Sequence, residues 1–406
     1  MNILFVYPRP DEIKRSRFGF SMNIAYASSV LKFKGNSTYF VDLSVQDLSN
    51  SQIFDMIEMN SIDRVFVEMD SFALKRSSNN QDALEILKLI KHRFTNLKTI
   101  AFGHACIMKR EEVDNADETI TCDILKYLLG GDYEYDSLPF PDRDLIESVE
   151  YYSAQPKSTL IQTSKGCLNS CIFCQRQGWQ NKFLAHDIDY VCREFYQLQE
   201  RGYKNIWIQD ENFTFNLSRA KSLLKRIIAE HLTDGMKISM SSWTKIDEEF
   251  LQLAARANIR ILSMGIESAN LEVLKFYRKD IDLERVKHLI GVADSLGIFT
   301  VGNFIIGAPV ENLAMINRTF DFIQRSGLDQ VNIKTLDFMI GSKLYEMLPR
   351  DKFPKDHYFG CLENGLGQIS LKELESLKSD FLKRYNLSQR ERLAKKIVKF
   401  GTPYED

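Results

Sequence analysis

The stretch Cys167-Leu168-Asn169-Ser170-Cys171-Ile172-Phe173-Cys174 gathers three thiols within eight residues. It follows residues 159–163, a short run of apolar and β-branched residues that is typical of a buried strand. Three closely spaced thiolates can hold three irons of a cubane iron–sulfur cluster. Because no fourth Cys lies nearby in the sequence, the remaining iron would lack a protein ligand and could bind a substrate or cofactor.

Two other interpretations of these thiols stay open. A zinc site usually needs four nitrogen or sulfur ligands, and the nearest later candidates are His186 and Cys192. A disulfide would need an oxidising compartment, for which the sequence gives no sign. Since the chain has only 7 Cys, a chance grouping of three is improbable, and the cluster is the preferred interpretation.

The composition is that of an ordinary globular protein. The 406 residues are 44% hydrophobic and 27% charged, which allows two or three domains with substantial cores. The formal net charge is −2, without long runs of one sign, so no sequence-wide electrostatic argument favours nucleic acid or an anionic membrane. The apolar run 3–7 ends at Pro8 and is too short for a signal peptide or a membrane span. We therefore expect a cytoplasmic protein.

Residues 1–135 alternate short apolar runs with amphipathic stretches, which predicts an N-terminal domain. The expected strands are 3–7, 37–41, 64–67 and 98–102, and the expected helices are 20–34, 45–59 and 82–94. This alternation predicts a doubly wound, Rossmann-like parallel sheet with its ligand crevice at the carboxyl ends of the strands. No Gly-x-Gly-x-x-Gly follows the first strand, which argues against a dinucleotide.

Regular strand–helix alternation resumes in residues 159–345, after a proline-containing linker at 136–158. The expected strands are 159–163, 205–209, 237–240, 260–265, 300–306 and 330–336, and the expected helices are 189–201, 217–231, 248–257, 271–277, 283–296 and 315–325. Six βα units predict a partial (β/α)6 barrel, with its chemistry at the carboxyl ends of the strands. Residues 346–406 should form a mostly helical extension with a helix at 371–400, so the fold class is α/β throughout the two larger parts.

The Cys motif, with an aromatic residue, Phe173, just before its last Cys, resembles the signature of the radical S-adenosylmethionine (SAM) superfamily, over about residues 159–345. The resemblance implies that Cys167, Cys171 and Cys174 bind a [4Fe-4S] cluster whose open iron chelates SAM. An electron from the cluster would cleave SAM to a 5′-deoxyadenosyl radical. A one-electron reductant such as flavodoxin or ferredoxin is then the expected partner.

Two acidic residues after the second barrel strand are similar to a SAM-binding segment of that superfamily. Asp210 and Glu211 stand where acidic groups of the family receive the SAM amino group, which needs a hydrogen-bond acceptor. A structural interpretation of the same segment stays open, in which Asn212 or Asn216 caps the following helix.

Two later segments also resemble parts of the family's SAM site. Gly265, Glu267 and Ser268 match the family's Gly-Ile-Glu-Ser, whose carboxylate binds the SAM ribose. Gly307 lies in segment 302–311, which resembles the turn and apolar wall at the adenine. Helix capping by Ser268 is compatible with this assignment, and packing of a buried strand would by itself explain the apolar part of the second segment.

The N-terminal domain resembles the cobalamin-binding domain of cobalamin-dependent radical SAM proteins. Pro8, Asp42, Gly103 and His104 follow the predicted strands where that family has similar residues. The Asp-x-His-x-x-Gly signature of methionine-synthase-like domains is absent, as is a Gly-Glu-Gly-Glu-like segment, in whose place the chain has Leu129-Gly130-Gly131-Asp132. The resemblance implies bound cobalamin, while a domain that kept the fold and lost the cofactor stays open.

The first functional hypothesis is cobalamin-dependent methylation of an unactivated carbon in a natural-product, lipid or cofactor precursor, with a small-molecule or peptide substrate. A second is a cobalamin-free radical SAM dehydratase, epimerase or ring-forming enzyme with a vestigial N-terminal domain, in which Cys361 could return a hydrogen atom. A third is a non-catalytic zinc or partner-binding protein on the same scaffold. The ratio of deoxyadenosine to S-adenosylhomocysteine distinguishes the first two hypotheses, and metal analysis tests the third.

Overall fold

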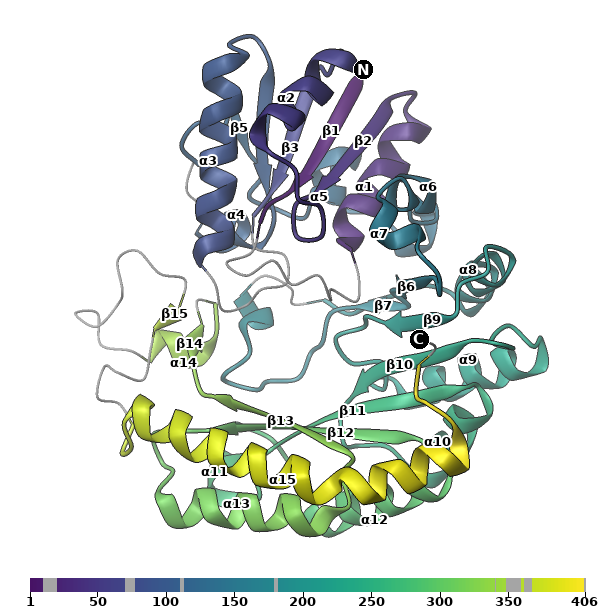
Figure 1. Ribbon diagram of the computed structural model, residues 1–406, viewed down its shortest axis with the longest axis vertical. Helices are drawn as coiled ribbons and strands as arrows, with labels where there is room; N and C mark the ends of the chain where they lie inside the picture. Colours follow the sequence, from purple (N-terminus) through teal and green to yellow (C-terminus); the bar gives the residue numbers. More distant parts are fainter. Residues whose placement is uncertain are drawn as a thin grey trace. The chain divides into compact units, whose positions relative to one another are not determined.

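The computed structural model describes residues 1–9, 20–69, 77–109, 113–178, 182–339, 341–347, 359–360 and 367–404. The chain folds into two compact units, Met1–Leu160 and Ile161–Asp406 (Figure 1). Each unit has a parallel sheet with helices, so the predicted α/β fold class is confirmed. The predicted crevice loops 10–17 and 70–72 lie outside the described residues, as does Cys361.

Unit 1 is built on a five-stranded parallel sheet with the order β2-β1-β3-β4-β5. Its strands are β1 (Asn2–Tyr7), β2 (Ser37–Asp42), β3 (Arg64–Glu68), β4 (Lys98–Phe102) and β5 (Glu118–Thr119). The first four match the predicted strands, whereas β5, with 2 residues, is too short to leave a sequence pattern. The strand order reverses between β1 and β3, which places the crevice of this doubly wound sheet at their carboxyl ends.

The helices between these strands are α1 (Met22–Phe33), α2 (Asn50–Met59), α3 (Ser77–Arg93) and α4 (His104–Lys109), and α5 (Ile124–Leu129) follows β5. Helix α2 begins later than residue 45, where the sequence pattern predicted it. Ser49 and Gln52 form a capping box at its start. Before the cap, the backbone N–H groups of Val45 and Gln46 donate to the Asp42 carbonyl in a turn, which keeps these residues out of the helix.

The segment predicted as a linker, 136–158, contains two short helices, α6 (Arg143–Glu147) and α7 (Glu150–Ser153), after a 3-10 turn at Tyr135–Ser137. Asp142 caps α6 and also accepts a hydrogen bond from Ser28 Oγ of α1 at 2.5 Å. The Arg143 guanidinium donates to Thr159 Oγ1 at 2.6 Å and to the Leu160 carbonyl at 2.7 Å. Because these contacts are buried, the segment is fixed within unit 1.

Unit 2 contains a six-stranded sheet with the order β13-β12-β11-β10-β9-β6. Its strands are β6 (Ser158–Ile161), β9 (Asn205–Ile208), β10 (Lys237–Ser242), β11 (Ile259–Glu267), β12 (Phe299–Ile306) and β13 (Gln330–Thr335). Each of the six predicted barrel strands is present, and the pairs from β9 to β13 are parallel. The boundary between the units falls inside β6.

The helices of the unit are α8 (Ile188–Glu200), α9 (Leu217–Ala229), α10 (Glu248–Arg256), α11 (Leu271–Phe276), α12 (Leu283–Ser295), α13 (Leu313–Ser326), α14 (Lys343–Glu346) and α15 (Leu371–Phe400). In Figure 1, α12, α13 and α15 lie along one side of strands β11–β13. Two small antiparallel pairs complete the unit, β7 (Ser164–Lys165) with β8 (Leu184–Ala185) and β14 (Phe338–Met339) with β15 (Phe359–Gly360).

Helix α15 has the bounds predicted from the sequence and is held on the sheet by buried polar contacts. Tyr385 Oη donates to the Leu328 carbonyl at 2.6 Å. Lys396 Nζ lies 2.8 Å from Asp329 Oδ2, and both side chains are almost fully buried. The helix is therefore an integral part of unit 2.

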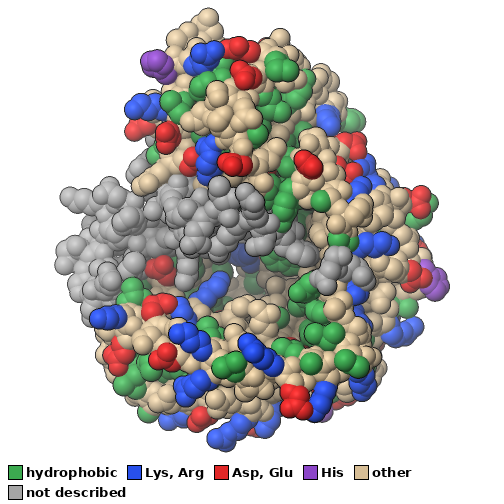
Figure 2. Space-filling view, viewed as in Figure 1, with side chains coloured by type: hydrophobic (Ala, Val, Ile, Leu, Met, Phe, Trp, Pro, Cys, Tyr) green, Lys and Arg blue, Asp and Glu red, His purple; other side chains and the backbone are tan. Residues whose placement is uncertain are grey.

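The charged side chains of the surface are of mixed sign. On the face drawn in Figure 2, basic and acidic side chains are interspersed, in agreement with the formal net charge of −2. Among the described residues, no helix has both the length and the apolar character needed to cross a membrane.

Candidate functional site

The three clustered thiols lie in the loop that follows β7. Cys171 is buried, while Cys167 and Cys174 are partly exposed. The Cys174 N–H donates to the Cys171 carbonyl at 3.1 Å, which makes the end of the loop a tight turn. Between them, Ile172 is fixed on both sides: its N–H donates to the Tyr277 carbonyl at 3.3 Å, and its carbonyl accepts from the Leu344 N–H at 2.9 Å. The loop is thus anchored to the ends of α11 and α14.

The thiols influence one another electrostatically. Burial raises the pKa of Cys171 to about 12, and the nearby Cys167 and Cys174 add to this rise, while Lys279 opposes it. Burial also raises the pKa of Cys174, against the opposing charge of Arg176. Without metal, Cys171 and Cys174 are therefore protonated at neutral pH, and metal binding must release these two protons.

The three thiols share one loop, between β7 and the 3-10 turn at Gln175–Gly178. Within the described residues, no three His, Cys, Asp or Glu side chains are placed to hold a single metal ion. A [4Fe-4S] cluster needs a different arrangement, because each thiolate binds its own iron. The alternative zinc ligands have other surroundings: Cys192 is buried in the core of unit 2, and the His186 ring stacks on Tyr190 with centroids 3.8 Å apart.

The acidic pair after β9 holds the loop that leads to the thiols. Both carboxylate oxygens of Asp210 accept hydrogen bonds, one from the Thr163 N–H at 2.7 Å and the other from Ser164 Oγ at 2.5 Å. Burial raises the pKa of Asp210 to about 6, although these hydrogen bonds act in the opposite direction. Glu211 accepts from the Gly166 N–H at 2.8 Å and lies near Arg176. The pair therefore positions the backbone just before Cys167.

The predicted ribose ligand Glu267 is part of a buried ion pair. Lys279 Nζ lies 2.6 Å from Glu267 Oε1 and donates to the Gly265 carbonyl at 2.7 Å. A Cβ at Gly265 would lie 2.6 Å from Glu267 Oε1, so glycine leaves the space that this carboxylate occupies. Glu267 has a φ of 67° at a bulge of β11, an unfavourable conformation for a non-glycine residue. Such strain is typical of functional positions.

The two other predicted SAM segments are also well fixed. Ser268 is fully buried, and its Oγ accepts from the Asn270 N–H at 3.2 Å, just before α11. Gly307 has a φ of 92°, and its N–H donates to Glu311 Oε2 at 2.6 Å. Burial raises the pKa of Glu311 to about 7. This carboxylate closes the turn after β12.

Several residues next to the predicted site were missed by the sequence reasoning. Lys279 pairs with Glu267, and its ammonium also lies 5.5 Å from the centre of the Trp243 ring. The Tyr277 ring packs edge-on against Phe173 at 5.1 Å between centroids, and its hydroxyl is buried without a hydrogen-bond partner in the described structure. Burial raises the pKa of Tyr277 well above its usual range. The sequence offered one signal for the ion pair: Lys279, a basic residue shortly after α11, the helix that follows Glu267. Asn216 does cap α9, as one structural interpretation allowed.

The residues predicted for cobalamin lie at the carboxyl edge of the sheet of unit 1. Pro8 follows β1, Asp42 ends β2, and Gly103 and His104 follow β4. Asp42 is buried, and its carboxylate accepts from Tyr152 Oη at 2.7 Å.

The packing of unit 1 by itself requires a glycine at position 103. Its φ is 115°, and a Cβ at this position would lie 2.5 Å from the Met69 carbonyl oxygen. Two of the four predicted residues thus have contacts within unit 1 that explain them without a ligand.

Comparison with known proteins defines the class. Residues 161–323 match the radical SAM superfamily, so the chain carries a radical SAM domain and the predicted resemblance is confirmed. For a domain of this superfamily, SAM and a [4Fe-4S] cluster are the expected cofactors.

Relatives and solved structures extend this result. A cytidylyl-2-hydroxyethylphosphonate methyltransferase from Streptomyces wedmorensis is 28% identical over 238 residues, which cover 54% of this chain and 44% of that protein. An uncharacterized methyltransferase from Pyrococcus horikoshii is 27% identical over 52% of this chain and 46% of its own length. The chain thus spans about half the length of these curated relatives.

Among solved structures, the radical SAM methyltransferase TsrM from Kitasatospora setae, with cobalamin and a [4Fe-4S] cluster bound, has a TM-score of 0.71 and 16% identity, over 84% of this chain and 76% of that one. The cobalamin-dependent radical SAM enzyme OxsB has a TM-score of 0.64 and 18% identity, over 86% of this chain and 55% of that one. At these identities the likeness supports the fold, including both units.

Proposed function

We propose that the chain cleaves SAM reductively at a [4Fe-4S] cluster and uses the resulting radical chemistry to methylate a carbon atom of a small-molecule substrate, with cobalamin as a second cofactor. The cluster loop carries this proposal, because its three thiols lie in one loop within a radical SAM domain, and a tight turn joins Cys171 to Cys174. The names of two relatives as methyltransferases and the cobalamin bound in TsrM support the finer assignment.

The thiolates of Cys167, Cys171 and Cys174 would hold the cluster. When bound, the cluster supplies the electron for SAM cleavage through an iron that no protein residue occupies. Asp210 and Glu211 contribute by keeping the preceding backbone in place, since their oxygens accept from residues 163–166. This role differs from direct binding of the SAM amino group and makes both residues positioning groups.

Glu267 would accept hydrogen bonds from the ribose hydroxyls of SAM. Its Oε1 already contacts Lys279, so the ion pair fixes the carboxylate and leaves Oε2 for the ligand. The turn at Gly307, closed by Glu311, would border the adenine. Ser268 contributes by ordering the backbone between β11 and α11.

The carboxyl edge of unit 1 would accommodate cobalamin. The strand order of its sheet places a ligand crevice between β1 and β3. When bound, cobalamin supplies the methyl carrier. Pro8, which follows β1, and His104, which begins α4, would border that crevice, while Asp42 and Gly103 serve the packing of the unit.

The deciding experiment is anaerobic reconstitution of the full chain with iron, sulfide and cobalamin, followed by mass spectrometry of the products of SAM. Cobalamin-dependent methylation should yield both deoxyadenosine and S-adenosylhomocysteine, with dithionite or reduced flavodoxin as electron donor. Deoxyadenosine alone, from protein that retains no cobalamin, would contradict methylation and leave SAM cleavage intact. Failure to form deoxyadenosine from protein with full iron content would overturn the whole proposal.

A second candidate is the cobalamin-free radical SAM enzyme. One observation favours it: contacts within unit 1 explain Asp42 and Gly103, two of the four residues predicted for cobalamin, without a bound cofactor. It predicts the outcome with deoxyadenosine alone in the same experiment.

A further inference from the structure

The sheet of unit 2 has one face that its helices leave open. In β13, Val331 and Ile333 are buried in the core with α13 and α15, while the alternate residues Gln330, Asn332 and Lys334 are exposed. Side chains of a strand point alternately to its two faces, so the exposed set lies on the face opposite the helices. Figure 1 shows α13 and α15 on the other side of these strands.

Polar side chains form a connected row across this open face. Asn332 of β13 pairs in register with Asn303 of β12, which in turn pairs with Gly265 of β11. Asn332 Nδ2 donates to Asn303 Oδ1 at 3.1 Å, and Asn303 Nδ2 donates to Ser263 Oγ at 2.8 Å. The row therefore runs across three neighbouring strands and reaches the position next to the Glu267–Lys279 pair.

The row presents unused hydrogen-bonding groups. Asn332 is exposed, and after its bond to Asn303 it keeps an amide oxygen and a second N–H for a ligand. Asparagine and serine are unusual residues for strand positions, which normally favour β-branched and aromatic side chains. Strand propensity therefore does not explain this row of polar side chains, whereas recognition of a ligand would explain it.

The charge on this face is positive at the carboxyl end of β13. Lys334 pairs in register with Ile305 and has no ion-pair partner among the described residues. On the open face of β10, β12 and β13, the described strands carry no Asp or Glu. The neighbouring carboxylate on β11, Glu267, is already neutralised by Lys279.

We infer that Ser263, Asn303, Asn332 and Lys334 form the substrate-recognition face of the barrel, and that the substrate is a polar small molecule with an oxyanion group placed at Lys334. The inference rests on the proposed function, since it names the substrate class of that same site. The amide row would hold hydroxyl or amide groups of the substrate beside the SAM site, and the ammonium would bind a phosphate, phosphonate or carboxylate.

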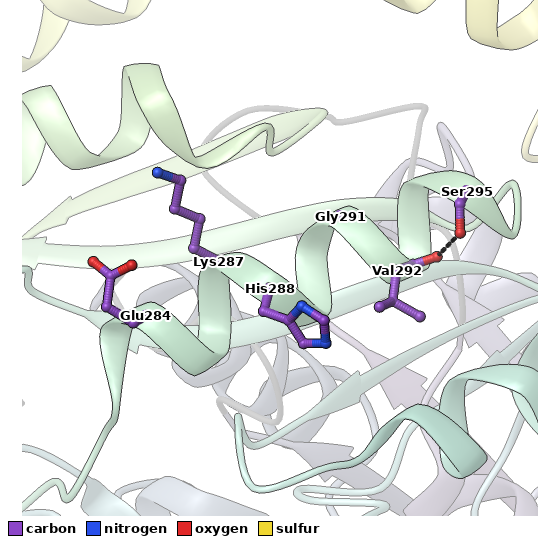
Figure 3. Close-up of a pocket in the computed structure, with 6 residues that line it drawn as sticks. All are labelled: Glu284, Lys287, His288, Gly291, Val292 and Ser295. Atoms are coloured by element: carbon purple, nitrogen blue, oxygen red, sulfur yellow. Dashed lines mark hydrogen bonds between the residues drawn. The ribbon is translucent and has the colours of Figure 1, made fainter.

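Another surface feature of the unit provides a control. A hollow on α12 is bordered by residues of that helix alone, among them Lys287 and His288 (Figure 3). Its His288 is already engaged, with Nε2 2.8 Å from Glu248 Oε1 on α10. Lys287 is thus an exposed lysine of the same unit outside the polar row.

The test measures binding of methylphosphonate and of acetate to the full-length protein, by phosphorus NMR and by calorimetry. The variants are Lys334→Met, Lys334→Arg and Asn332→Asp, with Lys287→Met as the matched control. Lys334→Met should weaken binding of the preferred anion at least tenfold, and Lys334→Arg should restore most of it. Asn332→Asp keeps the shape of the side chain and should weaken anion binding to a similar extent by adding a negative charge. Lys287→Met should bind as the wild type does.

The two probes distinguish the sources of the oxyanion: stronger binding of methylphosphonate assigns a phosphoryl or phosphonyl group, and stronger binding of acetate assigns a carboxylate. Equal binding of both anions to Lys334→Met and wild type would overturn the inference. So would a Lys334→Met variant that loses SAM affinity alone, because Lys334 would then serve the carboxylate of SAM. A wild type that binds the anion through Lys334 without cleaving SAM would contradict the proposed function and leave the anion site standing.

Discussion

Lys279 and Glu267 form a buried ion pair at the carboxyl end of β11, with Nζ and Oε1 2.6 Å apart and side chains only 4% and 9% exposed. A second lysine, Lys245, lies over the same Trp243 ring but pairs with the exposed Asp280. The two pairs differ mainly in burial, so they allow the energetic value of burial to be measured within one structure.

The first prediction concerns stability. Lys279→Met leaves the Glu267 charge buried and unpaired, so it should lower the free energy of unfolding by roughly 3–5 kcal/mol. The double variant Glu267→Gln/Lys279→Met should recover part of this loss. Urea denaturation measures both, with Lys245→Met as the control, which should cost at most about 1 kcal/mol because its pair is exposed. Equal losses for the two single lysine variants would show that burial does not determine the effect.

The second prediction concerns SAM affinity. Glu267→Gln replaces a charged hydrogen-bond acceptor by a neutral one of the same shape, and we expect SAM binding to weaken by roughly 1–3 kcal/mol. The iron content should not change, because Glu267 is not a ligand of the cluster. Equilibrium binding of SAM to the reconstituted protein, with iron analysis of the same sample, provides the measurement. Unaltered affinity would make this carboxylate purely structural.

The third prediction concerns the cluster. Replacing Cys167, Cys171 or Cys174 by Ala should abolish deoxyadenosine formation, because two thiolates do not hold a site-differentiated cubane. Cys192→Ala is the matched control, since this thiol is buried in the core of unit 2. It should keep its iron and its cleavage activity. Full cleavage by any variant of the loop would remove that residue from the ligand set.

The fourth prediction concerns pH. Burial raises the pKa of Glu311 from 4.5 to about 7, so the native state binds this proton more tightly than the unfolded chain does. The stability contributed by the neutral form is fully present below pH 4.5 and is lost as the pH rises to about 7, by roughly 3 kcal/mol in total at 1.4 kcal/mol per pKa unit. Glu311→Gln should therefore flatten the stability profile between these pH values. Parallel profiles of variant and wild type in urea denaturation would contradict the assignment.

The fifth prediction concerns unit 1. Gly103→Ala should destabilise the protein by roughly 1–3 kcal/mol with or without cobalamin, because the new Cβ would collide with the Met69 carbonyl and the φ is unfavourable for alanine. A still larger residue at this position would therefore test folding rather than cofactor binding. His104→Ala is the cleaner probe of the crevice. It should reduce retained cobalamin several-fold while the iron content stays as in the wild type, and unchanged retention would take His104 out of the contact surface.

The sequence was sufficient to predict those features that depend on residues close together in the chain. Strands such as β1, β3 and β4 are short apolar runs, and α15 has a pattern long enough to define both its ends. The Cys motif was equally visible, because its three thiols lie within one loop. Helix α2 shows the limit of periodicity, since the turn at Val45 depends on the Asp42 carbonyl and not on the apolar pattern.

Contacts between distant segments could not be predicted in this way. Lys279 meets Glu267 across α11, and a basic residue after this helix, the one signal in the sequence, does not by itself indicate an ion pair. The same holds for Asp210, whose carboxylate is occupied by Thr163, in the bend after β6, and by Ser164, at the start of β7. A sequence motif identified these acidic residues, but the tertiary structure decides what they bind.

Because α15 packs on the sheet of unit 2, the unit can complete its folding only after this helix has been synthesised. Until this helix has been synthesised, Asp329 lacks Lys396, and the apolar face of β13 lacks the cover that Phe381 and Tyr385 provide. Domains generally fold on the ribosome from the N-terminus onward, so unit 1 can fold while the barrel is still growing. Unit 2 would remain incomplete until its last helix emerges. Iron and sulfide should therefore be delivered to the Cys loop after translation of α15, and a ribosome-bound chain stalled before residue 371 should not retain a cluster.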